Sequence, residues 1–436
     1  MIAPHDRVAR PVERDEEIEA FYRLAVDVFH TEVDDREQVV RRVRRESEAE
    51  PGFNTAQRRG IFQAAMLVGR CMIHERVLRV GEGRLLTACI DGVATHPEHR
   101  LRGVGRAIME DAIACADARG HALLLLDGIA NFYDRFGFTR VFDLTDHAIY
   151  RPAMRALPAA EGELCRVRPV NMDDAPDLLG LYERHMAPYT GSFTRTLVQQ
   201  EYHTRQRLER GGPSLVAEAP DGSAAGYLFL QRGPLPALAI EIAADTWPAA
   251  AALLRRHADL LDAAPGAAQA ELTWMLPPNA PLLYRLVDHL VTADTSRPGP
   301  ASVDGSVRSH TYLHRSSGWM ARVVSLSRLI NGLLPAWRTR LTTAPAWSGS
   351  FSLQVAGQSC RITIDGSTIM QDDLPSAHDA VPVVLTPRQL AQLAFGYRPI
   401  SFVSAQTGAA VPAQLVPLLS VLFPCQPAFI PASDWF

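Results

Sequence analysis

Apolar and polar positions recur with different periods along the chain, and they predict strands alternating with helices. One stretch near the start has the period of an amphipathic helix, and its apolar face consists of Ile18, Phe21, Leu24, Ala25 and Phe29. Residues 61–80 and 85–95 are predicted as successive strands, a helix is expected at 104–118, and the apolar run 122–126 follows as a buried strand. This order indicates a mixed α/β fold with crossover helices.

The opening pattern recurs in the middle of the chain. Arg10-Pro11-Val12 precedes the first predicted helix, and Arg168-Pro169-Val170 precedes another one. In this second copy, two apolar runs flank Pro220-Asp221-Gly222, which predicts a hairpin. We therefore expect an internal duplication at the scale of a domain.

The last third of the chain has a different composition and is expected to be a separate α+β domain. Apolar strands are predicted there with antiparallel pairing and a hairpin turn at Asp365-Gly366. Thr386-Pro387 is typical of a helix start, since threonine is a good cap and proline suits the first helical position.

Two stretches rich in small residues and proline, 156–163 and 294–306, are predicted as linkers. The chain of 436 residues is also too long for one compact core. We expect three domains, at 1–155, 156–305 and 306–436.

Composition and charge narrow the functional classes. Hydrophobic residues make up 47% and charged residues 21%, which is ordinary globular usage and argues against disorder. The net charge of −4 gives no basic excess to attract nucleic acid or a membrane surface, and the six cysteines form no CxxC pair for a metal. No run approaches the roughly 18 apolar residues of a membrane span and no signal peptide is recognisable, so a cytoplasmic location is expected.

Residues 100–106, which we call the phosphate loop, carry the clearest chemical signal. The loop reads Arg100, Leu101, Arg102, Gly103, Val104, Gly105 and Arg106, and it joins a predicted strand to a predicted helix. Glycines let the backbone approach a ligand closely, and the unpaired N–H groups of a helix start favour a bound phosphate. The pattern therefore predicts a pyrophosphate site, with the arginines supplying positive charge beside it.

A second signature follows the buried strand, in the segment from Ala130 through Phe132, Tyr133 and Phe136 to Phe138. In this order the residues resemble the GNAT family of acyl-CoA-dependent N-acetyltransferases. The resemblance implies that main-chain groups of Val93, Ala94 and Thr95 pair with the pantetheine of acetyl-CoA. It also implies that amides from Leu101 to Arg106 hold the pyrophosphate. Many members have asparagine where this chain has Asp127, which puts pantetheine contacts from that strand in doubt.

The second copy offers a comparison within the same sequence. After its apolar strand at 238–243 comes AADTWPAAAALL, which has no glycine and no phosphate loop. We expect this copy to bind no pyrophosphate and to have a structural role.

The complete chain resembles the enhanced-intracellular-survival (Eis) acetyltransferases. The resemblance rests on residues 92–98, the Phe132-Tyr133 pair, residues 318–323 and the aromatic ending at 434–436. It implies two tandem GNAT folds, the second degenerate, and a C-terminal α+β domain like a sterol-carrier protein. It further implies a homo-oligomer, often a hexamer, and multi-amine substrates such as aminoglycosides.

The same resemblance implies the catalytic pair. Tyr133 would be the general acid, since a phenol with a pKa near about 10 stays protonated at neutral pH. The terminal carboxylate of Phe436 would be the general base. Its pKa near about 3.5 makes it a weak base, so it is expected to act through water or on an amine of lowered pKa.

Other interpretations remain open at this point. Tyr133 could be only a core aromatic, and the aromatic ending could be only a hydrophobic anchor. The protein could be a catalytically silent acyl-CoA-binding regulator or, ranked last, a lipid carrier. His74-Glu75 lacks the second histidine of a zinc motif, and Ser376, His378 and Asp379 form no recognisable triad, so neither set is expected to be a site.

Overall fold

The computed structural model describes residues 7–30, 32–149, 165–233, 235–266, 271–292, 307–312, 318–373 and 380–436. The two expected linkers at 156–163 and 294–306, and with them the expected domain boundaries, lie outside these residues. The chain divides into two compact units, and each is described by itself. Unit 1 comprises Met1–Phe142, His314–Gln426 and Phe436, and unit 2 comprises Asp143–Leu313 and Pro427–Trp435.

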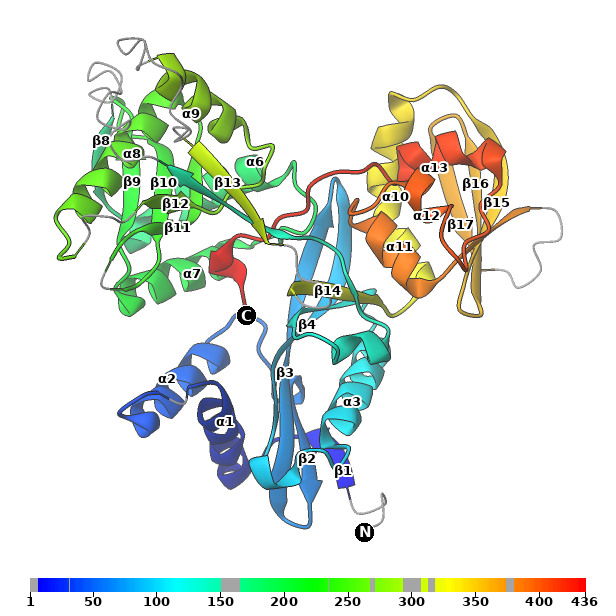
Figure 1. Cartoon of the computed structure of the whole chain (residues 1–436), viewed down its shortest axis with the longest axis horizontal. Coiled ribbons are helices and arrows are strands. Elements are labelled where there is room, and N and C mark those ends of the chain that lie inside the picture. Colours follow the sequence, from blue (N-terminus) through cyan, green and yellow to red (C-terminus); the bar gives the residue numbers. More distant parts are fainter. Residues whose placement is uncertain are drawn as a thin grey trace. The chain divides into compact units, whose positions relative to one another are not determined.

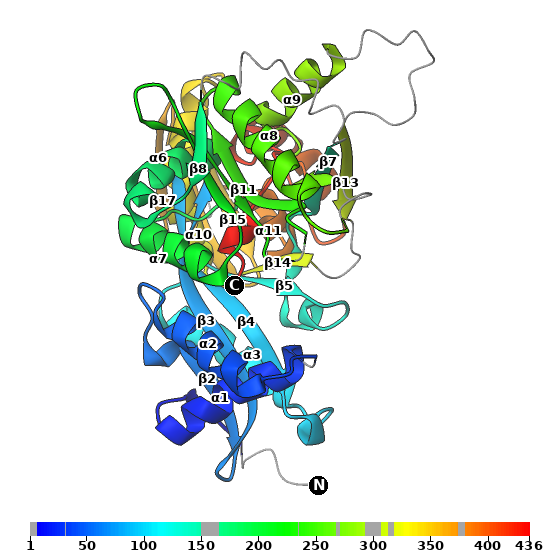
Figure 2. The ribbon, with the colours of Figure 1, turned by 90° about the vertical axis from the view of Figure 1, so that its left-hand side faces the viewer.

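Unit 1 contains a seven-stranded mixed sheet. Its order is β1 (Arg7–Pro11), β2 (Arg58–Gln63), β3 (Met66–Val80), β4 (Gly83–Thr95), β5 (Leu123–Gly128), β14 (Gly318–Val323) and β6 (Thr139–Arg140). The helices of this part are α1 (Asp15–Phe29), α2 (Arg36–Glu48) and α3 (Val104–Ala118). The long strands β3 and β4 form the centre of the sheet and are visible in both ribbon views (Figures 1 and 2).

Successive side chains along β3 point to opposite faces of the sheet and pack in two different apolar layers. Met72 packs in the cluster around α1, whereas Cys71 and Ile73 pack in the cluster around α3. The predicted helix 104–118 and the predicted strands on either side of it are confirmed. One detail of the first helix is wrong: Phe29 is 54% exposed, although the period places it with the buried face.

Unit 2 contains a second seven-stranded sheet. Its order is β8 (Arg166–Pro169), β9 (Ser214–Glu218), β10 (Ala224–Leu230), β11 (Leu238–Ala244), β12 (Leu272–Trp274), β7 (Leu144–Ile149) and β13 (Val307–Tyr312). The helices are α6 (Ala175–Met186), α7 (Leu197–Arg210), α8 (Trp247–Asp262) and α9 (Pro281–Thr292). The predicted hairpin is the antiparallel pair β9–β10.

The two sheets have the same strand order, which confirms the internal duplication. In each sheet the first five strands come from one copy, and a strand from elsewhere in the chain takes the sixth place. The sixth strand of the first sheet is β14, between β5 and β6, and the sixth strand of the second sheet is β7, between β12 and β13. The copies thus exchange one strand each, so a sheet does not correspond to one continuous range of the chain.

The last third adds a four-stranded sheet within unit 1. Its order is β17 (Thr368–Asp372), β16 (Gln358–Asp365), β15 (Ser348–Val355) and β18 (Val381–Leu385), with α10 (Leu326–Thr342), α11 (Pro387–Ala394), α12 (Ile400–Val403) and α13 (Val416–Leu422). Thr386 caps α11 as predicted. The expectation of antiparallel pairing throughout is wrong, because β15 and β18 are parallel.

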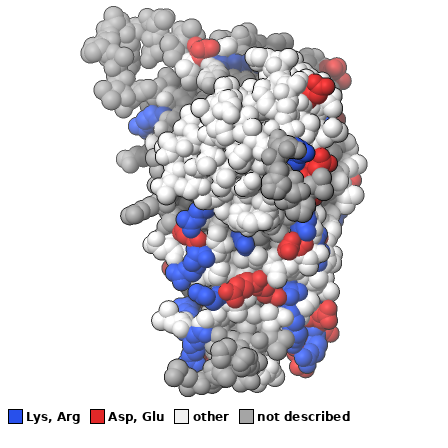
Figure 3. Space-filling model, turned by 90° about the vertical axis from the view of Figure 1, so that its right-hand side faces the viewer, with Lys and Arg blue, Asp and Glu red and all other residues white. Residues whose placement is uncertain are grey.

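The two parts of unit 1, the first sheet with its helices and the last third, differ in surface charge. On the face shown in Figure 3, blue and red side chains alternate over the part formed by the first sheet, and the part formed by the last third is mostly white. Among the described residues, no helix combines the length and apolar character that crossing a membrane requires.

Candidate active site

Strands β4 and β5 diverge in the middle of the first sheet. Their parallel pairing covers only Thr87 to Cys89 on β4, whereas the pairing of β4 with β3 extends to Thr95. A bulge interrupts the β3–β4 ladder next to Gly92, whose φ is +57°. The main chain of Val93 and Ala94 therefore lies in a segment of β4 that has no β5 strand beside it.

The phosphate loop follows directly and forms a tight turn with two residues of positive φ. Leu101 has a φ of +59° and is fully exposed, and Gly103, which precedes α3, has a φ of +83°. At the start of the helix the Ala107 N–H donates to the Gly103 carbonyl at 3.0 Å. The N–H groups before Ala107 belong to the first turn, and the N–H groups of a first turn have no hydrogen-bond partner within the helix.

Small residues hold this helix start against the sheet. Val104 is buried, and a Cβ at Gly69 of β3 would lie only 2.5 Å from a methyl carbon of Val104. A Cβ at Gly105 would lie 3.2 Å from the Phe132 ring and 3.8 Å from the Thr95 hydroxyl. The end of β4, the phosphate loop and the later aromatic signature therefore meet at Gly105. The side chains of Arg100, Arg102 and Arg106 are exposed around them.

Tyr133 begins a short 3-10 helix, Tyr133–Phe136, and is 8% exposed. Its ring packs edge-on against Phe132, with centroids 4.9 Å apart, and against Phe138 at 6.0 Å. Burial raises the pKa of Tyr133, and the neighbouring Cys71, Asp91 and Asp127 raise it further. The phenol therefore keeps its proton at neutral pH.

Phe436 lies against the first sheet. Its ring centroid is 5.4 Å from that of Trp319 on β14 and 6.0 Å from that of His74 on β3. Trp319 itself is buried, and it pairs across the sheet with Asp127 of β5. The exchanged strand β14 thus supplies a wall for the last residue of the chain.

A buried polar cluster surrounds His74. Its Nδ1 lies 2.7 Å from a Glu50 carboxylate oxygen and its Nε2 lies 3.8 Å from Asp91, while Arg76 pairs with Glu50. Burial alone would lower the pKa of His74, but Glu50 and Asp91 outweigh it and raise the pKa to about 9. Burial would raise the pKa of Glu50, but His74 and Arg76 lower it to about 2. The imidazole beside Phe436 is therefore charged at neutral pH.

This cluster was not predicted as a site from the sequence. His74 and Glu75 alternate on β3, and Glu75 pairs instead with Arg119 at 2.7 Å and His121 at 3.0 Å. The partner of His74 is Glu50, which precedes it by more than twenty residues, so no local motif indicates the pair. Among the residues that the structure describes, no group of His, Cys, Asp or Glu side chains is arranged to hold a metal ion. Ser376, His378 and Asp379 lie outside the described residues.

One residue of the aromatic ending is buried although it is charged. Trp435 is 39% exposed, whereas Asp434 is 3% exposed. The most buried residue of the ending is thus a charged one, which sequence hydrophobicity could not indicate.

The second copy has a different helix start at the position corresponding to the phosphate loop. The Thr246 side chain caps α8 by accepting a bond from the Ala249 N–H at 3.3 Å, and Pro248 occupies the first turn. This start has no residue of positive φ, and the side chain of Thr246 already satisfies one of its N–H groups.

Comparisons with known proteins agree with this geometry. Residues 9–141 match the family model of the acetyltransferase (GNAT) domain. A GCN5-related N-acetyltransferase from Kribbella flavida has a TM-score of 0.70 at 17% identity, covering 99% of this chain and 100% of that one. One from Anabaena variabilis ATCC 29413 has a TM-score of 0.71 at 14% identity, with the same coverage. Eis1 from Mycobacterium abscessus has a TM-score of 0.64 at 15% identity, covering 98% of this chain and 100% of that one.

No curated protein sequence matches the chain. At these low identities the solved structures establish the fold: the predicted arrangement of mixed α/β GNAT-like folds is confirmed. The likeness of the last third to a sterol-carrier protein stays a prediction.

Proposed function

We propose that this chain, in which residues 9–141 form a GNAT acetyltransferase domain, transfers acetyl from acetyl-CoA to a primary amine. The acceptor would be a small molecule or a peptide, with multi-amine compounds such as aminoglycosides as the first candidates. The observation that carries the proposal is the divergence of β4 from β5 directly before the glycine turn of α3. Such an opening leaves main-chain groups available along one wall and helix N–H groups at its end.

Acetyl-CoA would supply the acetyl group as a thioester. Main-chain groups of Val93, Ala94 and Thr95 would pair with the pantetheine, as a strand would. The N–H groups from Leu101 to Arg106 would hold the pyrophosphate. The positive φ of Gly103 fits this role, because glycine adopts this conformation without strain and has no side chain to cover the backbone at the helix start.

Tyr133 would donate a proton to the sulfur of the departing CoA. The phenol is protonated at neutral pH, as a proton donor must be before the transfer. As the C–S bond breaks, the proton moves from the phenol oxygen to the sulfur, and the new C–N bond forms at the acceptor nitrogen.

The terminal carboxylate of Phe436 would accept the proton that the acceptor amine loses. A carboxylate is a weak base, so we propose that the proton reaches it through water or comes from an amine of lowered pKa. The contacts of the Phe436 ring with Trp319 and His74 support this role, since they hold the end of the chain in one place on the first sheet. The second copy and the sterol-carrier-like last third would have structural roles, within a homo-oligomer.

The test is release of free thiol from acetyl-CoA with a panel of aminoglycosides, polyamines and lysine-containing peptides. The full chain and a chain lacking Phe436 are compared at the same protein concentration. Because the sequence contains no lysine, acetylation of the protein's own lysine side chains cannot contribute to the signal. We expect amine-dependent release by the full chain and its loss without Phe436. Acetyl-CoA binding without release for any amine would contradict the proposal.

A further inference from the structure

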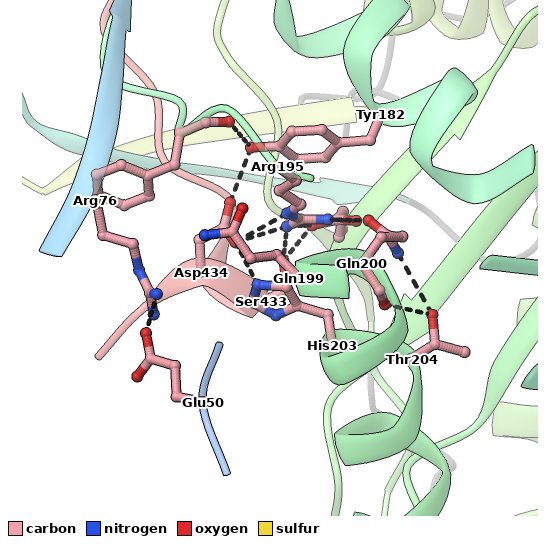
Figure 4. Close-up of polar contacts among 12 residues, drawn as sticks. Glu50, Arg76, Tyr182, Arg195, Gln199, Gln200, His203, Thr204, Ser433 and Asp434 are labelled. Atoms are coloured by element: carbon pink, nitrogen blue, oxygen red, sulfur yellow. Dashed lines mark hydrogen bonds and ion pairs between the residues drawn. The ribbon is translucent and has the colours of Figure 1, made fainter. Parts of the chain in front are cut away.

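A buried ion pair lies two residues before the end of the chain. Asp434 accepts bonds from Arg195 Nη2 at 2.7 Å and Arg195 Nε at 3.1 Å, and their side chains are 3% and 2% exposed (Figure 4). Tyr182 donates its hydroxyl to the other Asp434 oxygen at 2.9 Å. Arg195 comes from the segment before α7 and Tyr182 from α6, so the second copy encloses this carboxylate.

Arg195 already has a partner within the second copy. It donates to Glu241 on β11 at 2.7 Å, and Glu241 also accepts the Tyr227 hydroxyl at 2.6 Å. The guanidinium lies over the Tyr182 ring at 3.6 Å, and Gln200 accepts from its Nη1 at 3.1 Å. Glu241 therefore compensates the charge of Arg195 without any contribution from the C-terminus.

Asp434 and Ser433 come from residues 427–436, which we call the C-terminal tail, and Ser433 bonds to Glu241. Burying a second carboxylate beside Glu241 has a desolvation cost, and like charges in one site oppose each other. The second copy does not need this carboxylate for its own charge balance. The contact is better explained as a way of holding the C-terminal tail in place.

The rest of the tail is held in the same unit. The Phe429 N–H donates to the Thr190 carbonyl at 2.7 Å, and Ile430 is 2% exposed. Gly191, with a φ of +102°, passes so close that a Cβ there would lie 3.3 Å from the Phe429 carbonyl oxygen. Trp435 follows; it is 39% exposed, and its indole N–H donates to the Ile430 carbonyl at 3.2 Å within the tail. Asp434 therefore supplies a buried ionic contact two residues before Phe436.

We propose that Arg195 is a positioning residue for the terminal carboxylate and acts through Asp434. Consecutive Cα atoms are about 3.8 Å apart, so the Cα of Phe436 lies within about 8 Å of that of Asp434. Fixing Asp434 therefore restricts the terminal carboxylate to a small volume. The second copy, which has no phosphate loop, would thus contribute to catalysis by holding the end of the chain. This inference rests on the proposed role of Phe436 as base.

The experiment compares Asp434→Asn with Asp245→Asn in the full chain. Asp434 also lies 3.4 Å from His203 Nε2. Asp245 is a matched control in the same unit, because it too pairs with an arginine and a histidine, Arg184 at 2.7 Å and His185 at 2.9 Å, but is more exposed. For Asp434→Asn we expect kcat to fall at least about 10-fold, because small displacements of a catalytic group have large effects. The KM for acetyl-CoA should stay within about twofold of the wild type, since that ligand does not use this pair.

A second readout follows the tail directly. Carboxypeptidase release of Phe436, measured by intact mass, should be at least about 10-fold faster in Asp434→Asn and unchanged in Asp245→Asn. Tyr182→Phe removes one of the bonds to Asp434, together with the 2.7 Å contact of the same hydroxyl with the Phe193 carbonyl. It should change both readouts in the same direction by a smaller factor. It serves as the test variant if Asp434→Asn does not fold.

The outcomes separate the two proposals. If the chain lacking Phe436 retains full activity, the terminal carboxylate is not the base, and the proposed mechanism fails. If that chain is inactive but Asp434→Asn matches Asp245→Asn in kcat and in Phe436 release, the positioning role of Arg195 is refuted and the base assignment stands.

Discussion

The two copies of the fold share a strand order and differ at the start of one helix. In the first copy, α3 begins after Gly103, with a φ of +83°, and after the exposed Leu101. In the second copy, α8 begins after Thr246, whose side chain accepts a bond from the Ala249 N–H. The side-chain cap that stabilises α8 occupies an N–H group that a phosphate would need. The same architecture thus has a helix start without a side-chain cap in one copy and a capped helix start in the other.

The two copies also differ in the charged side chains that they bury. The second copy buries Arg195, Glu241 and Tyr182 together, and they enclose Asp434 of the tail. The first copy has a charged cluster around His74, next to Phe436. The second copy thus has no phosphate loop but binds a carboxylate of the C-terminal tail.

The largest expected effect concerns the hydroxyl of Tyr133. Tyr133→Phe should lower kcat about 100-fold or more while acetyl-CoA affinity stays unchanged, since a general acid contributes about 10²–10⁴-fold. Tyr312→Phe, on β13 of the second sheet, is the control and should have full activity. Calorimetric affinity and amine-dependent thiol release give the two quantities. An unchanged kcat in Tyr133→Phe would favour a silent acyl-CoA-binding regulator.

A matched pair of substitutions tests the two helix starts. Gly103→Val places a β-branched residue at positive φ and should weaken acetyl-CoA binding about 10-fold or more. Thr246→Val removes the cap of α8 and should lower the free energy of unfolding by about 1 kcal/mol, with no change in affinity. Titration calorimetry and chemical denaturation measure these effects. Equal losses of affinity in both variants would remove the distinction between the copies.

The smallest expected effect is a difference in pH dependence between two buried histidines. The pKa of His74 in the first copy is raised to about 9, so its stabilising contribution is complete below about pH 6.5 and is lost as the pH rises through 9. Burial lowers the pKa of His257 in the second copy to about 4, so its contribution is present above about pH 6.5 and is lost as the pH falls through 4.

Hydrogen exchange, measured on peptides from each unit during denaturation at several pH values, gives the pH dependence of stability for each unit. Unit 1 should lose at most about 3 kcal/mol between pH 6.5 and 9, and His74→Gln should remove this loss. Unit 2 should lose stability only toward acid, and His257→Gln should remove that loss. The same pH dependence in both units would contradict the assignment of the two histidines.

Features set by neighbouring residues could be predicted from the sequence. The helix 104–118 has the bounds of α3, and Thr386 caps α11, because period and capping are local properties. The glycines of the phosphate loop likewise indicated a turn before this helix. The catalytic roles of Tyr133 and Phe436 stay predictions.

Features set by distant residues could not be predicted. Strands β7 and β14 each pair within the sheet of the other copy. The sequence of a single strand does not indicate which sheet it joins. The His74–Glu50 and Arg195–Asp434 pairs join residues far apart in sequence. A charged residue in an aromatic ending also indicates solvent exposure by ordinary rules, and Asp434 is buried only because Arg195 and Tyr182 are there to receive it.

The most direct test of this division between the copies is the stoichiometry of acetyl-CoA binding to the full chain. Isothermal titration calorimetry with the wild-type protein measures the number of sites without requiring the acceptor amine. The account predicts one molecule of acetyl-CoA per chain, bound by the first copy. Two molecules per chain, or no binding at all, would contradict it.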